Sequence, residues 1–415
     1  MYRKHTLPNG VRIITEEIDH VRSVAIGIWV KTGSRNETKG YEGISHFIEH
    51  MFFKGTQKRS ARELAETLEA VGGQLNAFTT KEFTCYYARV LDEHVPLAID
   101  VLSDMFFNSR FDNKEIEKEK NVVLEEIKMY QDTPDELIHD LFSRYVWENN
   151  SLGKPILGEE ETIKGFNEQK IRAYLESNYS QDRIVIAVAG KIKHEDIVKR
   201  LACFGEFQRP GTELSLEKPK GSTVRKSVIK DTEQLHLIVG VPGLGQDDEY
   251  MPTLQIINNI LGGGLSSRLF QEIREQRGLA YSVYSYHSTY VDTGLFAVYA
   301  GTSLAKVEEV IKCIVEQLDC LKENGITEEE LRKTKAQIKG SLYLGLESVS
   351  SRMSRLGKTE LAFGKVKTVD ETVEQIEKVS LANIKELLQQ LWQRGKISIL
   401  TLGKELKTDF DRLLQ

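Results

Sequence analysis

The stretch CYYARVLDEHVPLAIDVLSDMFFNSRFDNKEIEKEKNVVLEEI, residues 85–127, has a counterpart in the second half of the sequence, FAVYAGTSLAKVEEVIKCIVEQLDCLKENGITEEELRKTKAQIKGSL, residues 296–342. The two align with Tyr87 over Tyr299. Each reads as a strand, a long helix, a turn, an acidic helix start and a second long helix. One such stretch per half predicts two duplicated domains rather than a short-period solenoid, although any two strand-helix-helix units share this outline.

Length and composition predict where the domains meet. At 415 residues the chain is too long for one ordinary core, so two domains of roughly 200 residues each are expected. Residues 208–223, QRPGTELSLEKPKGST, contain two prolines and two glycines without hydrophobic periodicity, which predicts a linker. We therefore expect domains at residues 1–207 and 224–415. Short alternating runs interleaved with amphipathic segments indicate the α+β class.

The composition argues against several classes of protein. Hydrophobic residues make up 40% of the chain and charged residues 28%, which is typical of a soluble globular protein. The net charge of -6 argues against nucleic acid or an anionic membrane surface as a partner. No C-x-x-C pair occurs, so we expect reduced thiols and a cytoplasmic location. The N-terminal strand pattern leaves no room for a signal peptide, and no apolar run reaches the roughly 18 residues of a membrane helix.

Residues 43–56, GISHFIEHMFFKGT, place two histidines and a glutamate in a run that otherwise reads as buried. His46, Glu49 and His50 form the pattern H-x-x-E-H. On a helix, residues four apart project from one face, so the two imidazoles can reach one cation. Zinc binds neutral imidazole nitrogens and carboxylate oxygens. Three solvent-facing polar residues would be the simpler interpretation, but the surrounding Phe, Ile and Met argue against it.

A third metal ligand should be a polar residue on an otherwise apolar helix face. In residues 112–131, DNKEIEKEKNVVLEEIKMYQ, the apolar stripe includes Ile116 and Val123. At 100 degrees per residue, Glu119 and Glu126 lie on that same stripe. A buried carboxylate needs a cation or a strong hydrogen-bond donor, and zinc would supply the cation.

The H-x-x-E-H motif, followed 76 positions after its second histidine by Glu126 within EKEKNVVLEEI, resembles the pitrilysin family of metallopeptidases. This family includes the mitochondrial processing peptidase and bacterial proteins of about this length, and the resemblance covers nearly the whole chain. It implies one Zn²⁺ per chain, held by His46, His50 and Glu126. It also implies Glu49 as the catalytic base and Glu119 as a carboxylate in the outer shell of the metal.

The same resemblance implies a set of substrate-binding residues. Residues 72–84, GGQLNAFTTKEFT, resemble the strand to which the family adds an extended peptide. Residues 262–283, GGGLSSRLFQEIREQRGLAYSV, resemble the family's glycine-rich loop with an arginine and a tyrosine seven apart. The implied residues are Asn76, Ala77, Phe78, Gly262, Gly263 and Gly264 for substrate binding, and Arg274 and Tyr281 for catalysis.

The repeat predicts that only one half binds the metal. Its offset of about 212 to 215 positions puts the equivalents of the three metal residues near Asn258, Gly262 and Ser341, none of which can bind zinc. The glycine-rich run at residues 262–267 could also suggest a phosphate-binding loop. It lacks the G-K-[ST] ending and the preceding strand that such a loop requires.

From these residues and this resemblance we expect a zinc-dependent endopeptidase that cleaves peptides or unfolded segments bound as an added edge strand. Glu49 would activate a zinc-bound water. The resemblance further implies that each domain is a largely antiparallel sheet with helices packed on one face, and that the protein is a homodimer. Two alternatives remain, a non-catalytic structural or chaperone-like subunit of the same fold and a zinc hydrolase that acts on a small molecule.

Overall fold

The strands of the N-terminal half form one sheet in the order β1-β2-β6-β3-β5-β4. The computed structural model of the chain describes residues 2–212 and 216–414. The strands are β1 (Tyr2–Thr6), β2 (Arg12–Glu17), β3 (Ser23–Val30), β4 (Gln74–Thr79), β5 (Thr84–Leu91) and β6 (Ile184–Gly190). Neighbouring strands are antiparallel except β2 and β6, which are parallel. The central strands β3 and β6 are almost entirely buried because both faces of the sheet are covered.

The strands of the C-terminal half repeat this arrangement. They are β7 (Arg225–Ile229), β8 (Leu235–Gly243), β9 (Ala280–Thr289), β10 (Gly294–Thr302) and β11 (Ser398–Gly403), in the order β7-β11-β8-β10-β9. Again one neighbouring pair is parallel, β7 with β11, and the others are antiparallel. This order matches β2-β6-β3-β5-β4 strand for strand and direction for direction. The α+β class with two duplicated domains is therefore confirmed.

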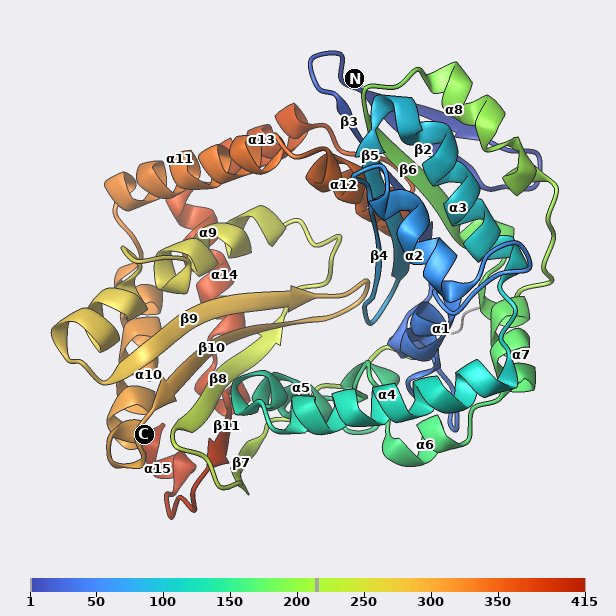
Figure 1. The fold of residues 1–415 in the computed structure, drawn as a ribbon. Helices are drawn as coiled ribbons and strands as arrows, with labels where there is room; N and C mark the ends of the chain where they lie inside the picture. The colour runs from blue at the N-terminus through green and yellow to red at the C-terminus, as the bar shows by residue number, and fades with distance from the viewer. Residues whose placement is uncertain (1, 213–215, 415) are drawn as a thin grey trace. The chain divides into compact units, whose positions relative to one another are not determined.

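Helices of the first unit cover both faces of its sheet (Figure 1). They are α1 (Ile44–Phe52), α2 (Ala61–Glu69), α3 (Val95–Asn108), α4 (Asn113–Gln131), α6 (Glu160–Lys164), α7 (Glu168–Asn178), α8 (His194–Arg200) and α12 (Val349–Phe363). Helices α1, α3 and α4 bury their apolar side chains in one cluster with the inner face of β3. On the opposite face α12 packs alone, and the indole of Trp29 donates a hydrogen bond to Met353 Sδ at 3.3 Å.

The second unit is built in the same way around its own sheet. Its helices are α5 (Pro134–Val146), α9 (Met251–Gly262), α10 (Val307–Asn324), α11 (Glu328–Gly345), α13 (Val369–Glu377), α14 (Leu381–Leu391) and α15 (Phe410–Leu413). Helices α9, α10 and α14 pack on one face of the sheet. Helix α5 covers the other face, where Phe142 lies in a cluster with Ile238 and Leu295.

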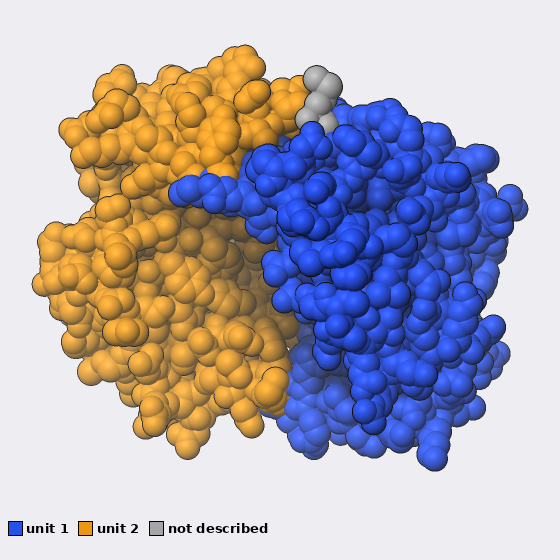
Figure 2. Space-filling view, turned by 45° about the horizontal axis from the view of Figure 1, so that its top comes forward, with its two compact units in different colours: residues 1–128, 154–216, 344–366 blue, residues 129–153, 217–343, 367–415 orange. Residues whose placement is uncertain are grey.

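Figure 2 shows the two compact units in different colours. Relative to the halves of the sequence, the units exchange one helix each. Unit 1 comprises residues 1–128, 154–216 and 344–366, and unit 2 comprises residues 129–153, 217–343 and 367–415. Helix α5 thus belongs to the second unit although it lies in the first half of the sequence, and α12 belongs to the first unit. Both helices cover the sheet face that the other helices leave apolar. Each sheet thus has helices on both faces, so the expectation of helices on one face only is corrected.

The change of unit at residues 216 and 217 falls within the predicted linker, residues 208–223. Residues 213–215 of this linker lie outside the described residues. The predicted domain limits, residues 1–207 and 224–415, stay a prediction, and the helix exchange means that neither compact unit is one continuous segment. Within the described part of the chain, no helix is long and apolar enough to cross a bilayer. The expected cytoplasmic location stays a prediction as well.

Candidate metal centre

Helix α1 carries His46, Glu49 and His50 on a segment whose other face is buried. The helix begins after Gly43, which has a left-handed φ of 90° and lies so close to Gly158 that a Cβ would come within 2.7 Å of that residue's Cα. The Glu37 carboxylate accepts hydrogen bonds from the backbone N–H groups of Gly43 (2.7 Å) and Ser45 (2.8 Å). A buried helix start needs such a partner for its free N–H groups, and Glu37 provides it.

Helix α4 brings the third potential ligand to α1. Glu126 Oε1 lies 3.7 Å from His46 Nε2, and Glu126 Oε2 lies 3.7 Å from His50 Nε2. One ligand atom from each of these residues lies within 4.8 Å of the others, and among the described residues this is the group that could hold a metal ion. Ligand atoms around a tetrahedral zinc lie roughly 3.4 Å apart. Two imidazole nitrogens and one carboxylate oxygen therefore fit a zinc ion with one position left for water.

The pKa values of the two imidazoles are shifted in opposite directions. Burial, together with the neighbouring His50, lowers the pKa of His46 to about 3, so its ring is neutral. Glu119 is only 3% exposed, and its Oε1 lies 2.7 Å from His50 Nδ1. Because an ionised carboxylate can only accept, Nδ1 carries a proton, and Nε2 is the nitrogen that faces Glu126. Burial lowers the pKa of His50, but the hydrogen bond with Glu119 and the neighbouring carboxylates raise it overall, so a metal ion must displace a proton from Nε2. Lys54 Nζ lies 2.6 Å from the other oxygen of Glu119.

Glu49 lies between the two histidines in sequence but is not part of the ligand group. Its Oε2 accepts a hydrogen bond from the hydroxyl of Thr79, the last residue of β4. Burial raises the pKa of Glu49, while the hydrogen bond from Thr79 lowers it. A raised carboxyl pKa beside a potential metal-bound water is suited to accepting and returning a proton.

Strand β4 provides the edge of the sheet beside this group. It is the last strand in the order and pairs with β5 on its other side. Asn76 is exposed, Ala77 is buried against α1, and Phe78 packs edge-on against Trp29 with ring centroids 5.6 Å apart. The Phe78 side chain therefore belongs to the core on the α12 side, so any contact it makes with a peptide would be through its backbone.

The remaining predicted residues belong to the second unit. Arg274 stacks on the ring of Tyr281 at 4.4 Å from its centroid, and Tyr281 is 75% exposed. Gly262 ends α9 and is followed by Gly263 and Gly264. A Cβ on Gly262 would lie 2.1 Å from the backbone nitrogen of Ser285, so no histidine fits at this equivalent of His50.

Three residues of the centre were not predicted from the sequence. They are Glu37 at the start of α1, Lys54 beside Glu119 and Thr79 beside Glu49. Lys54 lies four positions after His50, but this spacing alone does not distinguish it from other lysines near helix ends. Each of these residues acts through a tertiary contact that no sequence pattern encodes.

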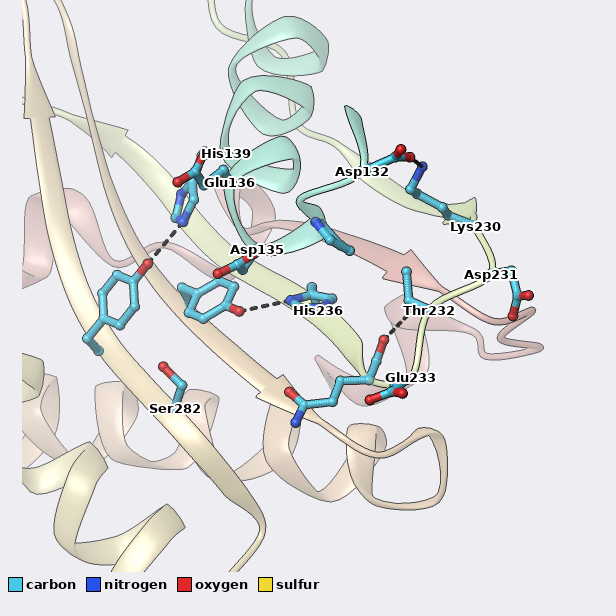
Figure 3. Close-up of a pocket in the computed structure, with 14 residues that line it drawn as sticks. Asp132, Asp135, Glu136, His139, Lys230, Asp231, Thr232, Glu233, His236 and Ser282 are labelled. Atoms are coloured by element: carbon cyan, nitrogen blue, oxygen red, sulfur yellow. Dashed lines mark hydrogen bonds and ion pairs between the residues drawn. The ribbon is translucent and has the colours of Figure 1, made fainter. Parts of the chain in front are cut away.

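A separate cavity of about 720 Å³ lies in the second unit, between the start of α5 and strands β8, β9 and β10 (Figure 3). His139 Nδ1 lies 2.9 Å from the hydroxyl of Tyr286, and His236 Nδ1 lies 2.8 Å from that of Tyr299. Both histidines are therefore hydrogen-bonded to tyrosine hydroxyls. The first contact joins α5 to β9, and the second joins β8 to β10. Among the described residues, neither histidine belongs to a ligand group like that of α1 and α4.

Comparison with known proteins identifies the family. Residues 12–160 match the model described as Insulinase (Peptidase family M16), and residues 165–338 match the model described as Peptidase M16 inactive domain. A Bacillus subtilis (strain 168) protein, described as "Uncharacterized zinc protease YmxG", is 52% identical over 392 residues, which cover 94% of this chain and 96% of that protein. The chain belongs to peptidase family M16. The predicted pitrilysin-family membership is confirmed.

Other M16 proteins share the length and fold of the chain. A Streptomyces coelicolor protein, described as "Uncharacterized zinc protease SCO5738", is 41% identical over 408 residues, covering 96% of this chain and 89% of that protein. The solved M16 inactive domain from Pseudomonas fluorescens superimposes with a TM-score of 0.92 at 18% identity and covers 99% of both chains. At that identity the likeness establishes the fold alone. His46, His50 and Glu126 all lie in the segment that matches the first M16 model.

Proposed function

We propose that the protein is a zinc-dependent endopeptidase. The observation that carries this proposal is the group formed by His46, His50 and Glu126, in which two imidazole nitrogens and a carboxylate oxygen leave one position for water. A bound zinc would polarise the scissile carbonyl and lower the pKa of its water. Relatives described as zinc proteases support this choice of metal, and we propose one ion per chain.

The side chains of this chain would then perform distinct steps. Glu49 accepts the proton of the attacking water and returns it to the leaving amine. His50 keeps its orientation because Glu119 holds Nδ1–H, and Glu119 is held in turn by Lys54. Arg274 and Tyr281 would donate hydrogen bonds to substrate carbonyl groups, which matter most when negative charge develops on the oxygen.

The substrate would be an extended peptide that adds to the edge of β4. Edge addition uses backbone hydrogen bonds, so it suits peptides and unfolded segments of varied sequence. The exposed Asn76 and the backbone of Ala77 and Phe78 lie along that edge. We propose that the glycine-rich residues Gly262 to Gly264 also contact the peptide, and that the protein acts as a homodimer with processing-peptidase-like activity.

The alternative is a non-catalytic subunit of the same fold, a question that the match of residues 165–338 to the inactive-domain model raises for the chain as a whole. This segment contains neither Glu49 nor any residue of the metal group, so the match describes the other half of the chain. Cleavage of a fluorogenic peptide, measured before and after chelation and again after zinc is restored, tests the proposal. Chelator-sensitive cleavage supports the peptidase. Zinc binding without peptide cleavage would favour the non-catalytic subunit or a hydrolase of small molecules.

A further inference from the structure

Thr79 connects the strand that would bind the peptide to the residue that would act as the base. It is the last residue of β4, and the alternation of side chains along a strand points it, like Ala77, toward α1. Its hydroxyl donates a hydrogen bond to Glu49 Oε2. The same hydrogen bond is one of the influences that lower the pKa of Glu49.

The Thr79 hydroxyl restricts the terminal side-chain torsion of Glu49. The terminal torsion of a glutamate side chain is broad, so a carboxylate without a fixed partner samples many orientations. A base must present one oxygen to its water at hydrogen-bond distance, and small misplacements cost rate. With Oε2 held by Thr79, Oε1 is the oxygen available to the water.

We propose that Thr79 is a positioning residue, whose hydroxyl fixes the carboxylate of Glu49 relative to the peptide bound on β4. This inference rests on the proposed peptidase function. Because the backbone of Thr79 is part of β4, a single strand fixes both the peptide and the base. The hydroxyl therefore affects the chemical step and leaves zinc and peptide affinity unchanged.

The competing interpretation is that Thr79 only favours the strand, as β-branched residues do. Thr79→Val separates the two, because valine keeps the β-branched shape and removes the donor. Thr79→Ser does the opposite, because serine keeps the donor and loses a methyl group. Thr67→Val is the matched control, since the Thr67 hydroxyl also forms a hydrogen bond, to the Glu63 carbonyl oxygen, but lies on α2 away from Glu49.

We expect Thr79→Val to lower kcat by about 10- to 100-fold, with KM close to that of the wild type. Its zinc affinity, the affinity of the metal-free protein for an uncleaved peptide and its melting temperature should stay unchanged. Thr79→Ser should restore most of kcat, and Thr67→Val should match the wild type. Normal kcat in Thr79→Val would overturn the inference, as would a Thr79→Ser variant as slow as Thr79→Val.

The double variant tests whether Thr79 acts through Glu49. In a Glu49→Gln background, Thr79→Val should slow the residual single-turnover rate no further, because the group it positions is already gone. An equal loss in both backgrounds would show that Thr79 acts elsewhere and would overturn the inference. Full activity of Glu49→Gln alone would instead contradict the proposed function, so the two failures can be told apart.

Discussion

The 2.7 Å contact between His50 Nδ1 and Glu119 Oε1 determines which nitrogen of His50 can bind a metal. Glu119 is buried, and its other oxygen lies 2.6 Å from Lys54 Nζ. Three side chains, Lys54, Glu119 and His50, are therefore linked in sequence from the segment after α1 to the imidazole. Outer-shell partners of this kind orient metal ligands and raise their basicity.

Glu126 and Glu119 should differ in their effect on zinc. Glu126→Gln removes a ligand oxygen, so zinc affinity should fall sharply. Glu119→Gln only disturbs the orientation of His50 and should weaken affinity by about 10- to 100-fold. Competition with a chelator of known affinity measures both constants. Equal losses of affinity in the two variants would contradict the assignment of Glu126 as a ligand and Glu119 as an outer-shell carboxylate.

Lys54 should affect zinc binding through Glu119. Lys54→Met removes the cation that holds Glu119 Oε2. We therefore expect zinc affinity to fall, by less than it falls in Glu119→Gln. Adding Lys54→Met to Glu119→Gln should cost little more, because the two residues act as one unit. The exposed Lys58, substituted in the same way, provides the control. Additive losses would show that Lys54 acts independently of Glu119.

Glu49→Gln should separate catalysis from metal binding. Because Glu49 is not in the ligand group, the variant should keep its zinc and its fold. Its rate of peptide cleavage should fall by about 10²- to 10⁴-fold, since the general base is lost. Elemental analysis and a peptide assay on the same sample check both expectations. A variant without zinc, or one that cleaves at the normal rate, would contradict the assigned role.

The local part of the centre could be predicted from the sequence because it follows from helix geometry. The spacing of His46 and His50 sets them on one face of α1, and 100 degrees per residue puts Glu119 and Glu126 on one stripe of α4. That the two helices meet depended on the family resemblance. The partners Lys54 and Thr79 could not be predicted, because their contacts depend on how α4 and β4 pack on α1.

The duplicated fold was predictable for a similar reason, and the helix exchange was not. Helices α5 and α12 each bury an apolar stripe, with Phe142 and Met353 among its members. The helical period of such a stripe does not indicate which sheet it covers. Each sheet has a second apolar face, and the helix that covers it comes from the other half of the sequence.

His139 should make the stability of the protein depend on pH. Burial lowers its pKa to about 4 in the folded protein, against about 6.5 for an imidazole in an unfolded chain. Between these values the unfolded chain binds a proton that the folded protein does not, so the free energy of unfolding falls as the pH is lowered. His139→Gln should lose less stability than the wild type between about pH 7 and about pH 5. Chemical denaturation at both pH values measures this, and the exposed His20, changed to Gln, provides the control.

Activity of mixed dimers should show whether each active site of the proposed homodimer is shared between chains. Glu49 belongs to the first unit and Arg274 to the second, so Glu49→Gln and Arg274→Ala disable different units. If the two units that form a site come from different chains, a mixed dimer has one site with both defects and one with neither. Random pairing after subunit exchange should then restore about a quarter of wild-type activity, because half of the dimers are mixed and each has one good site of two. If each site lies within one chain, every site keeps a defect and mixing restores nothing. Native mass spectrometry verifies the exchange, and a fully active monomer in sedimentation would contradict the shared site.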